Sequence, residues 1–184
     1  MAKTFQTFEP KLRKFIEAQK MFFVATAPMG ADGHINLSPK GLPGTFTVLD
    51  DQSIAYLDFT GSGVETIAHV RENGRICVMF CAFDGPPRIV RVHGSGDVIE
   101  PGDEEFAALR TKFDEYPGVR AIIRVRATRI SDSCGYGVPL YDYRGERDQL
   151  QRWAENKGPD AVAKYQEENN AQSLDGLPSL LGDH

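Results

Sequence analysis

The segment Asp58–Phe80 constrains the fold of this chain more than any other. It reads DFTGSGVETIAHVRENGRICVMF, in which an apolar strand runs into a small-residue turn, a short helix follows and a second apolar strand ends the unit. Glycines let a ligand approach the backbone closely, and the unpaired N–H groups at a helix start suit a phosphate. The segment therefore predicts a strand–turn–helix–strand unit whose turn, residues 60–63, is a candidate anion site.

A second cluster of small and polar residues precedes this unit. Residues 36–41 read NLSPKG, and the alternation of a strand places Asn36, Ser38 and Lys40 on one face. Three polar groups at a strand end can hydrogen-bond the edge of a heteroaromatic ring, and Lys40 adds a positive charge. Taken alone, the cluster is more typical of an edge strand with a wet face. Together with the turn, it indicates a pocket for an anionic cofactor.

The turn itself has two interpretations. Ser62 followed three residues later by Glu65 fits a capping box, which needs no ligand. A capping box does not explain the flanking Gly61 and Gly63, whereas a ligand-binding turn does. From this segment alone, capping and ligand binding are equally favoured.

The remaining pattern is one of short apolar strands separated by tight turns, with helices between some of them. Such a pattern favours a barrel or sandwich of six or seven mostly antiparallel strands, an α+β fold that is mainly β. The Gly94-Ser95-Gly96 run inside a strand predicts a bulge or a barrel corner. Strands are expected at residues 21–27, 34–38, 45–49, 53–59, 75–83, 88–99 and 121–130, and helices at 10–19, 65–72, 103–115, 145–156 and 159–168.

Two regions are expected along the chain. Residues 1–132 form the barrel domain, and residues 133–184 form a C-terminal loop and helical extension that packs on the barrel or on a partner chain. The last segment, from Asn169 onward, is polar and contains Gly and Pro, which predicts an extended or frayed end.

Composition narrows the class of protein. The 184 residues suffice for one domain with a sizeable core, and the net charge of −5 argues against a general nucleic-acid binder. No apolar run is long enough to span a membrane, and the first residues lack the core of a signal peptide. The three cysteines lack the spacing of a disulfide framework, so a reducing, cytoplasmic setting is expected.

A few other residues have side chains suited to chemistry. Arg88 and Arg91 begin a strand and suit a phosphate clamp or ion pairs at a strand edge. Cys77 and Cys81 share the face of an apolar strand and are expected to be structural thiols, whereas Cys134 lies in a glycine-rich loop and is the one candidate for a reactive thiol. The histidines have no metal-site spacing, and no metal or catalytic residue is assigned.

The order of these elements resembles that of the pyridoxamine 5′-phosphate oxidase-like family of flavin-binding split barrels. The similarity covers about residues 1–130, with its best local match in the strand–turn–helix–strand unit, and the motifs that carry it are NLSPKG, DFTGSG, HVRENGR and ICVMFCAF. The tail from Ser133, which begins SCGYGVPLYDYRGERDQ, looks like that of an uncharacterised branch of the same family.

The resemblance implies a homodimer that binds two FMN molecules in clefts between the subunits. It places the isoalloxazine edge at the second and third strands, the phosphate at the turn and following helix, and partner residues around the pocket. The cofactor-binding residues implied in this way are Asn36, Ser38, Lys40 and Gly41 for the ring, Thr60, Gly61, Ser62 and Thr66 for the phosphate, and Arg88, Arg91 or Trp153 for the partner's contribution.

The chain departs from the true oxidases of that family at Gly63-Val64, where they carry an Arg-Lys pair. The resemblance therefore implies a branch other than the vitamin B6 oxidases, with an FMN-dependent oxidoreductase activity on a small substrate. Alternatives that stay open are a non-enzymatic, stress-related protein on the same fold, and deazaflavin or haem as the bound group.

Overall fold

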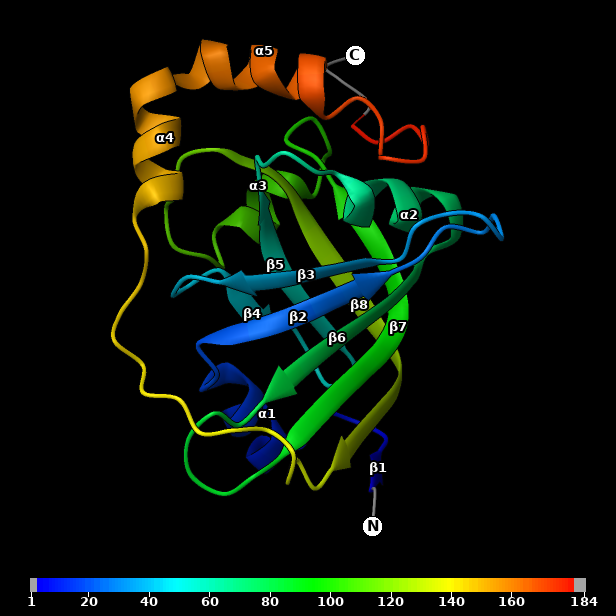
Figure 1. The fold of residues 1–184 in the computed structure, drawn as a ribbon, viewed down its shortest axis with the longest axis vertical. Coiled ribbons are helices and arrows are strands. Elements are labelled where there is room, and N and C mark those ends of the chain that lie inside the picture. Colours follow the sequence, from blue (N-terminus) through cyan, green and yellow to red (C-terminus); the bar gives the residue numbers. More distant parts are fainter. Residues whose placement is uncertain (1–2, 181–184) are drawn as a thin grey trace.

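The computed structural model describes residues 3–180, and its central feature is one antiparallel sheet that curls into a half-open barrel (Figure 1). The strand order is β3-β2-β6-β7-β8-β5-β4, and the two-residue β1 pairs with β8. The expected antiparallel split barrel is confirmed, with the short β1 as an additional strand. The strands are β1 (Thr4–Phe5), β2 (Met21–Thr26), β3 (Asn36–Gly41), β4 (Phe46–Val48), β5 (Ser53–Phe59), β6 (Arg75–Cys81), β7 (Ile89–Ile99) and β8 (Val119–Ser133).

Helices cover the ends of the barrel and its outside. Figure 1 shows α1 at the end near the N-terminus, α2 at the opposite end, and α4 and α5 beyond α2 on the outside. The helices are α1 (Pro10–Glu17), α2 (Glu65–Asn73), α3 (Phe106–Arg110), α4 (Gln149–Lys157) and α5 (Pro159–Asn169). An extended segment, residues 134–148, connects β8 to α4 along the side of the barrel.

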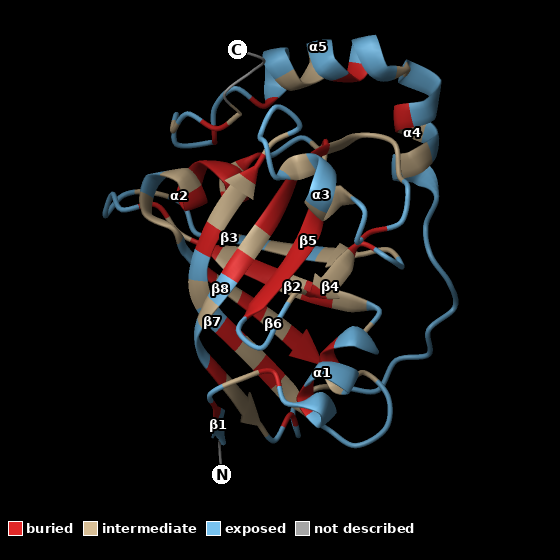
Figure 2. Ribbon diagram, turned by 180° about the vertical axis from the view of Figure 1, so that it is seen from behind, coloured by how far each residue is buried: buried red, intermediate tan, exposed pale blue. Residues whose placement is uncertain are grey.

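Alternating side chains build the core. Phe22, Val24 and Thr26 of β2 are buried, whereas the residues between them are only half-buried, as period-two strands predict. Phe22 lies against Tyr56 and Phe80 across the barrel interior, with ring centroids 5.4 and 5.6 Å apart. Figure 2 shows the buried residues concentrated on the strands, while α4, α5 and the connecting segment are largely exposed.

Two glycines occupy backbone positions that other residues would disfavour. Gly74 ends α2 in the left-handed conformation, with φ of 71°. At Gly94 the register of β7 against β8 shifts, and a Cβ there would lie 2.2 Å from the carbonyl oxygen of Arg126. The bulge is confirmed, because only a residue without a side chain allows this approach.

The helix expected at residues 103–115 is much shorter than its apolar pattern suggests. Only Phe106–Arg110 is helical, because Asp103 and Thr111 form local hydrogen bonds that favour turns, to the N–H of Glu100 and the carbonyl of Ala108. The apolar stripe still packs inward, since Phe113 is buried in a second cluster with Leu57, Ile99 and Ile122.

Candidate functional site

The Thr60–Gly63 turn lies between β5 and α2, as the sequence predicts. Thr60 is buried, and both its N–H and its hydroxyl donate to the carbonyl of Gly118, at 2.8 and 2.9 Å. Within the part of the chain that the structure describes, the N–H groups of Gly61, Ser62 and Gly63 have no hydrogen-bond acceptor. A Cβ at Gly61 would meet no heavy atom closer than 3.9 Å, so the turn has room for a ligand beside unpaired donors.

The capping box proposed for this turn is wrong. Helix α2 has Val64 at its N-cap, and no side chain caps it. The Glu65 carboxylate instead lies against Gly63 and accepts a hydrogen bond from the N–H of Leu174, at 3.2 Å. The Glu65 carboxylate therefore bonds a backbone group 109 residues away in place of the helix N-terminus.

The polar face of β3 turns toward α2 and forms a connected network. The Asn36 side-chain amide donates to the hydroxyls of Thr26 and Thr66, at 3.1 and 3.0 Å, and the Ser38 hydroxyl donates to Asn36 Oδ1 at 2.8 Å. Both amide hydrogens of Asn36 are therefore used within the protein. Ser38, which is half-buried, keeps the acceptor capacity of its hydroxyl for a ligand.

The network continues to His69, a fully buried residue of α2 that the sequence analysis did not single out. Its Nδ1 lies 3.0 Å from the hydroxyl of Thr26. Because that hydroxyl accepts from Asn36, it can donate to Nδ1, which places the imidazole proton on Nε2. Burial lowers the pKa of His69, so the ring is neutral at neutral pH, and Nε2 is buried without a partner in the described chain.

Lys40, the cation expected to face the ligand, is held by a buried carboxylate. Its ammonium lies 2.7 Å from Asp58, and the guanidinium of Arg120 lies 2.7 Å from the other oxygen of the same residue. Burial acts to raise the pKa of Asp58, but Lys40 and Arg120 together hold it below its usual range. Two cations and one anion leave this triad with one net positive charge, and Arg120 also donates to the carbonyl of Gly63 at 2.8 Å.

The C-terminal segment completes the back of the turn. Asn170 is fully buried, donates to the carbonyl of Gly61 at 2.9 Å and accepts from Arg120 at 2.8 Å. Gln166 donates to the Thr60 hydroxyl at 2.7 Å. The expectation of an extended or frayed end from Asn169 is therefore wrong as far as residue 180. The residues beyond it lie outside the described part. Nothing local in the sequence signals these contacts, because their partners lie 50 to 109 positions away.

The other candidates lie apart from the turn. Arg88 pairs with Asp132 at 2.9 Å and lies over the ring of Phe15 in α1, at the end of the barrel opposite α2 (Figure 1). Arg91 donates to the Ser133 hydroxyl. Trp153 packs on α5 against Tyr165, with ring centroids 5.2 Å apart. Within one subunit, the structure thus groups Asn36, Ser38, Lys40, Thr60, Gly61, Ser62 and Thr66 in one region, and places Arg88, Arg91 and Trp153 elsewhere.

Gly41 marks the far end of the polar face. Its carbonyl accepts the hydroxyl of Thr45 at 2.8 Å, and a Cβ at Gly41 would lie 3.0 Å from the carbonyl of Lys20. This close approach lets the end of β3 lie against the residue preceding β2.

The described residues offer neither a metal site nor a membrane-spanning helix. Across residues 3–180, no group of three or more His, Cys, Asp or Glu side chains is arranged to hold a metal ion. No helix in the same range is long and apolar enough to cross a bilayer.

Comparison with known proteins identifies related chains. The family model described as pyridoxamine 5′-phosphate oxidase matches residues 8–134. The pyridoxamine 5′-phosphate oxidase family protein ustO of Aspergillus flavus is 42% identical over 194 aligned residues, which cover 96% of this chain and 77% of that protein. The matched region of the family model ends where the connecting segment begins.

Solved structures show the same fold at low sequence identity. HupZ of Group A Streptococcus superposes with a TM-score of 0.53 at 22% identity, over 68% of this chain and 99% of its own. The FAD-binding protein of Mycobacterium smegmatis superposes with a TM-score of 0.50 at 15% identity, over 71% of this chain and 96% of its own. Both structures share the fold of the barrel with this chain.

Proposed function

Because the chain belongs to the pyridoxamine 5′-phosphate oxidase family, we propose that it is an FMN-dependent oxidoreductase that acts on a small substrate. The observation that carries this proposal is the Thr60–Gly63 turn, which has three unpaired N–H groups and whose Gly63 carbonyl is bonded by Arg120 of a triad with one net positive charge. Unpaired donors at a helix start together with a positive charge suit a flavin phosphate.

The residues of the turn and of β3 have distinct roles in this proposal. The N–H groups of Gly61, Ser62 and Gly63 hold the phosphate, and the Lys40–Asp58–Arg120 triad provides the positive charge that the absent Arg-Lys pair would otherwise supply. Ser38 and Lys40 lie on the face of β3 that borders the ring. A bound flavin would supply the chemistry of hydride or electron transfer.

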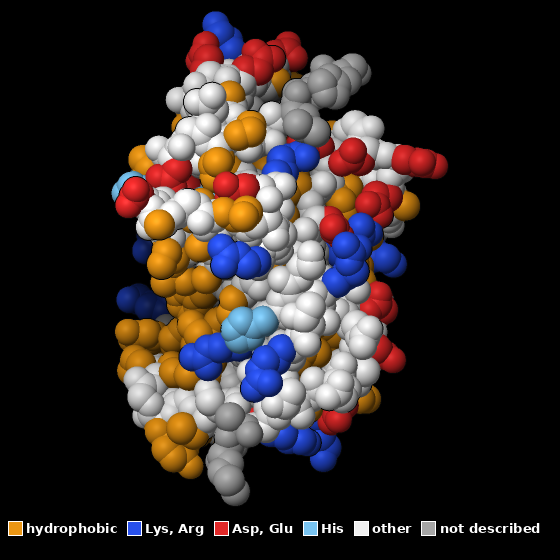
Figure 3. Space-filling view, turned by 90° about the vertical axis from the view of Figure 1, so that its right-hand side faces the viewer, with side chains coloured by type: hydrophobic (Ala, Val, Ile, Leu, Met, Phe, Trp, Pro, Cys, Tyr) orange, Lys and Arg blue, Asp and Glu red, His pale blue; other side chains and the backbone are white. Residues whose placement is uncertain are grey.

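We also propose that the protein is a homodimer and that the partner completes the cofactor cleft. On the outer face of the sheet, apolar side chains of neighbouring strands are only partly covered by the rest of the chain. Phe23 and Met79 are half-buried there, and Leu37 is 64% exposed. In Figure 3 apolar side chains gather in a patch that borders Lys, Arg and His side chains. An apolar sheet face of this kind suits a second copy of the chain.

The direct test is titration of the purified protein with FMN and with riboflavin, which lacks the phosphate. We expect FMN to bind at least tenfold more tightly, and a Gly61→Val substitution to reduce this preference because its side chain fills the space beside the unpaired N–H groups. Gly102→Val is the matched control, since Gly102 also has open space around it but lies in the turn before α3. Equal binding of the two flavins, or no binding, would contradict the proposed phosphate site.

The enzymatic part of the proposal has a separate test. Anaerobic addition of a nicotinamide donor to the flavin-loaded protein should bleach the flavin absorption bands. A flavin that binds but is not reduced by any donor would instead support the non-enzymatic alternative, and a Soret band in the purified protein would support haem.

A further inference from the structure

The segment between β8 and α4, residues 134–148, is fixed against the barrel at defined points. A Cβ at Gly135, where φ is 65°, would lie 2.7 Å from the backbone nitrogen of Arg88, so this end of the segment packs tightly. Farther along, the N–H of Tyr141 donates to the carbonyl of Phe83 at 2.9 Å, and the two rings pack with centroids 5.6 Å apart. We call residues 134–148 the strap.

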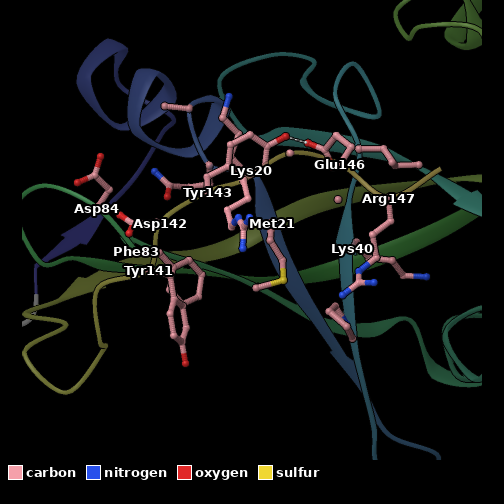
Figure 4. Close-up of a pocket in the computed structure, with 17 residues that line it drawn as sticks. Lys20, Met21, Lys40, Phe83, Asp84, Tyr141, Asp142, Tyr143, Glu146 and Arg147 are labelled. Atoms are coloured by element: carbon pink, nitrogen blue, oxygen red, sulfur yellow. Dashed lines mark hydrogen bonds between the residues drawn. The ribbon is translucent and has the colours of Figure 1, made fainter. Parts of the chain in front are cut away.

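The strap borders an open cavity of about 810 Å³ against the end of β3 and the start of β2 (Figure 4). A volume of this size accommodates a small molecule. Its apolar wall includes Met21, Pro39, Phe83 and Tyr141. Aromatic and thioether side chains of this kind favour a flat, apolar ligand body.

The strap also brings two unpaired cations to the cavity. Arg144 and Arg147 line it, and neither guanidinium has a hydrogen-bond or ion-pair partner within residues 3–180. Three carboxylates also line the cavity, those of Asp84, Asp142 and Glu146; Glu146 accepts the hydroxyl of Tyr143 and Asp84 accepts the N–H of Gly85, so neither carboxylate is paired with these guanidinium groups. Free guanidinium groups bind carboxylates through two parallel hydrogen bonds.

The cavity shares only residues at the end of β3 with the proposed cofactor site. Lys40 and Gly41 line it, whereas Asn36, Ser38 and the Thr60–Gly63 turn do not. A ligand under the strap would therefore lie beside the end of β3 and leave the turn free.

We propose that the strap cavity is a binding site for an aromatic carboxylate, with the ring against Phe83, Tyr141 and Met21 and the carboxylate on Arg144 or Arg147. That this ligand is the substrate rests on the function proposed above, since Lys40 is common to both sites. The binding itself depends on the strap, Phe83 and Met21 and does not require the Thr60–Gly63 turn.

The test compares two fluorescent probes of the same shape, 2-naphthoate and the neutral 2-naphthamide, by titration of flavin-free protein. We expect the wild type to prefer the naphthoate, and Arg144→Gln with Arg147→Gln to weaken naphthoate binding by about tenfold to a hundredfold, the range for a charge-assisted hydrogen bond. The double variant should bind the naphthamide as the wild type does. The control is Arg152→Gln in α4, because Arg152 pairs with Asp148 and does not line the cavity.

Equal affinity for the two probes, or naphthoate binding that is unchanged in the double variant, would overturn the proposal. A second titration with saturating FMN should leave naphthoate binding in place. Competition between the two would also overturn it, because the cavity would then be part of the flavin site. Naphthoate binding by a protein that fails to bind FMN would uphold the strap site and reject the flavin function.

Discussion

Asp58 is the residue on which the polar interior of this barrel depends. Its side chain is fully buried and satisfies two cations, of which Arg120 has a side chain only 4% exposed. Removing one partner of a buried ionic group leaves the other charges without compensation, which costs about 3–5 kcal/mol. Asp58→Asn should lower the free energy of unfolding by that amount in urea denaturation. Asp148→Asn, which breaks an exposed pair with Arg152, should leave it nearly unchanged.

His69 should make stability depend on pH. Burial lowers its pKa, while the more weakly acting carboxylates Asp175, Glu65 and Glu72 oppose this shift. The unfolded chain therefore binds a proton at a higher pH than the folded chain, and the free energy of unfolding should fall as the pH drops below about 6.5. His69→Gln should flatten this part of the curve. His93→Gln on the exposed face of β7 should keep it, and an unchanged slope in His69→Gln would reject the assignment.

The three thiols should differ in reactivity. Burial raises the pKa of Cys77 and of Cys81, against a weaker opposing effect of Arg91, whereas Cys134 is exposed at the start of the strap. Thiolates are the reactive form, so a thiol reagent applied to the folded protein at neutral pH should modify Cys134 first. Cys134→Ser should abolish the fastest phase of thiol modification, followed by absorbance with the same reagent. A fast phase that persists in that variant would show that one of the sheet thiols is accessible.

At the scale of elements, hydrogen bonds of Asn170 join the C-terminal segment to the Thr60–Gly63 turn and to Arg120. Asn170→Ala removes the side chain that joins Arg120 to the carbonyl of Gly61, which leaves buried polar groups unpaired at a cost of about 1–3 kcal/mol. We expect lower stability and faster amide exchange at residues 60–63. Asn169→Ala is the matched control, since that side chain is exposed and contacts only the carbonyl of Tyr165. Equal effects of the two substitutions would contradict the coupling.

These contacts also show where inference from sequence succeeds and where it ends. Local rules of alternation and backbone conformation account for strands such as β2 and β6, for the end of α2 at Gly74 and for the bulge at Gly94. These features can therefore be predicted from the sequence. The role of Asn170 depends on a buried arginine 50 positions earlier, and no local pattern encodes such a pair.

The site residues divide in the same way. The alternation of a strand predicts that Asn36, Ser38 and Lys40 share one face, and the glycines and hydroxyls of residues 60–63 indicate the turn. Asp58, which pairs with Lys40, and Arg120, which pairs with Asp58, lie in strands whose patterns indicate only alternation and burial. The free donors of the site therefore became clear only from the three-dimensional structure.

At the scale of the whole molecule, the outer face of the sheet is the surface through which we propose that two copies pair. Met79 lies near the middle of a cross-strand row that runs from Pro39 through Phe23 to Arg91. If two copies pair through this face, a charge at its centre is buried without a partner, so Met79→Asp should convert the dimer to a monomer in sedimentation velocity. Met29→Asp places the same charge on a methionine that is 70% exposed outside this row, and it should leave the dimer intact. A wild-type protein that sediments as a monomer would reject the shared cleft, and a dimer in Met79→Asp would move the interface to another face.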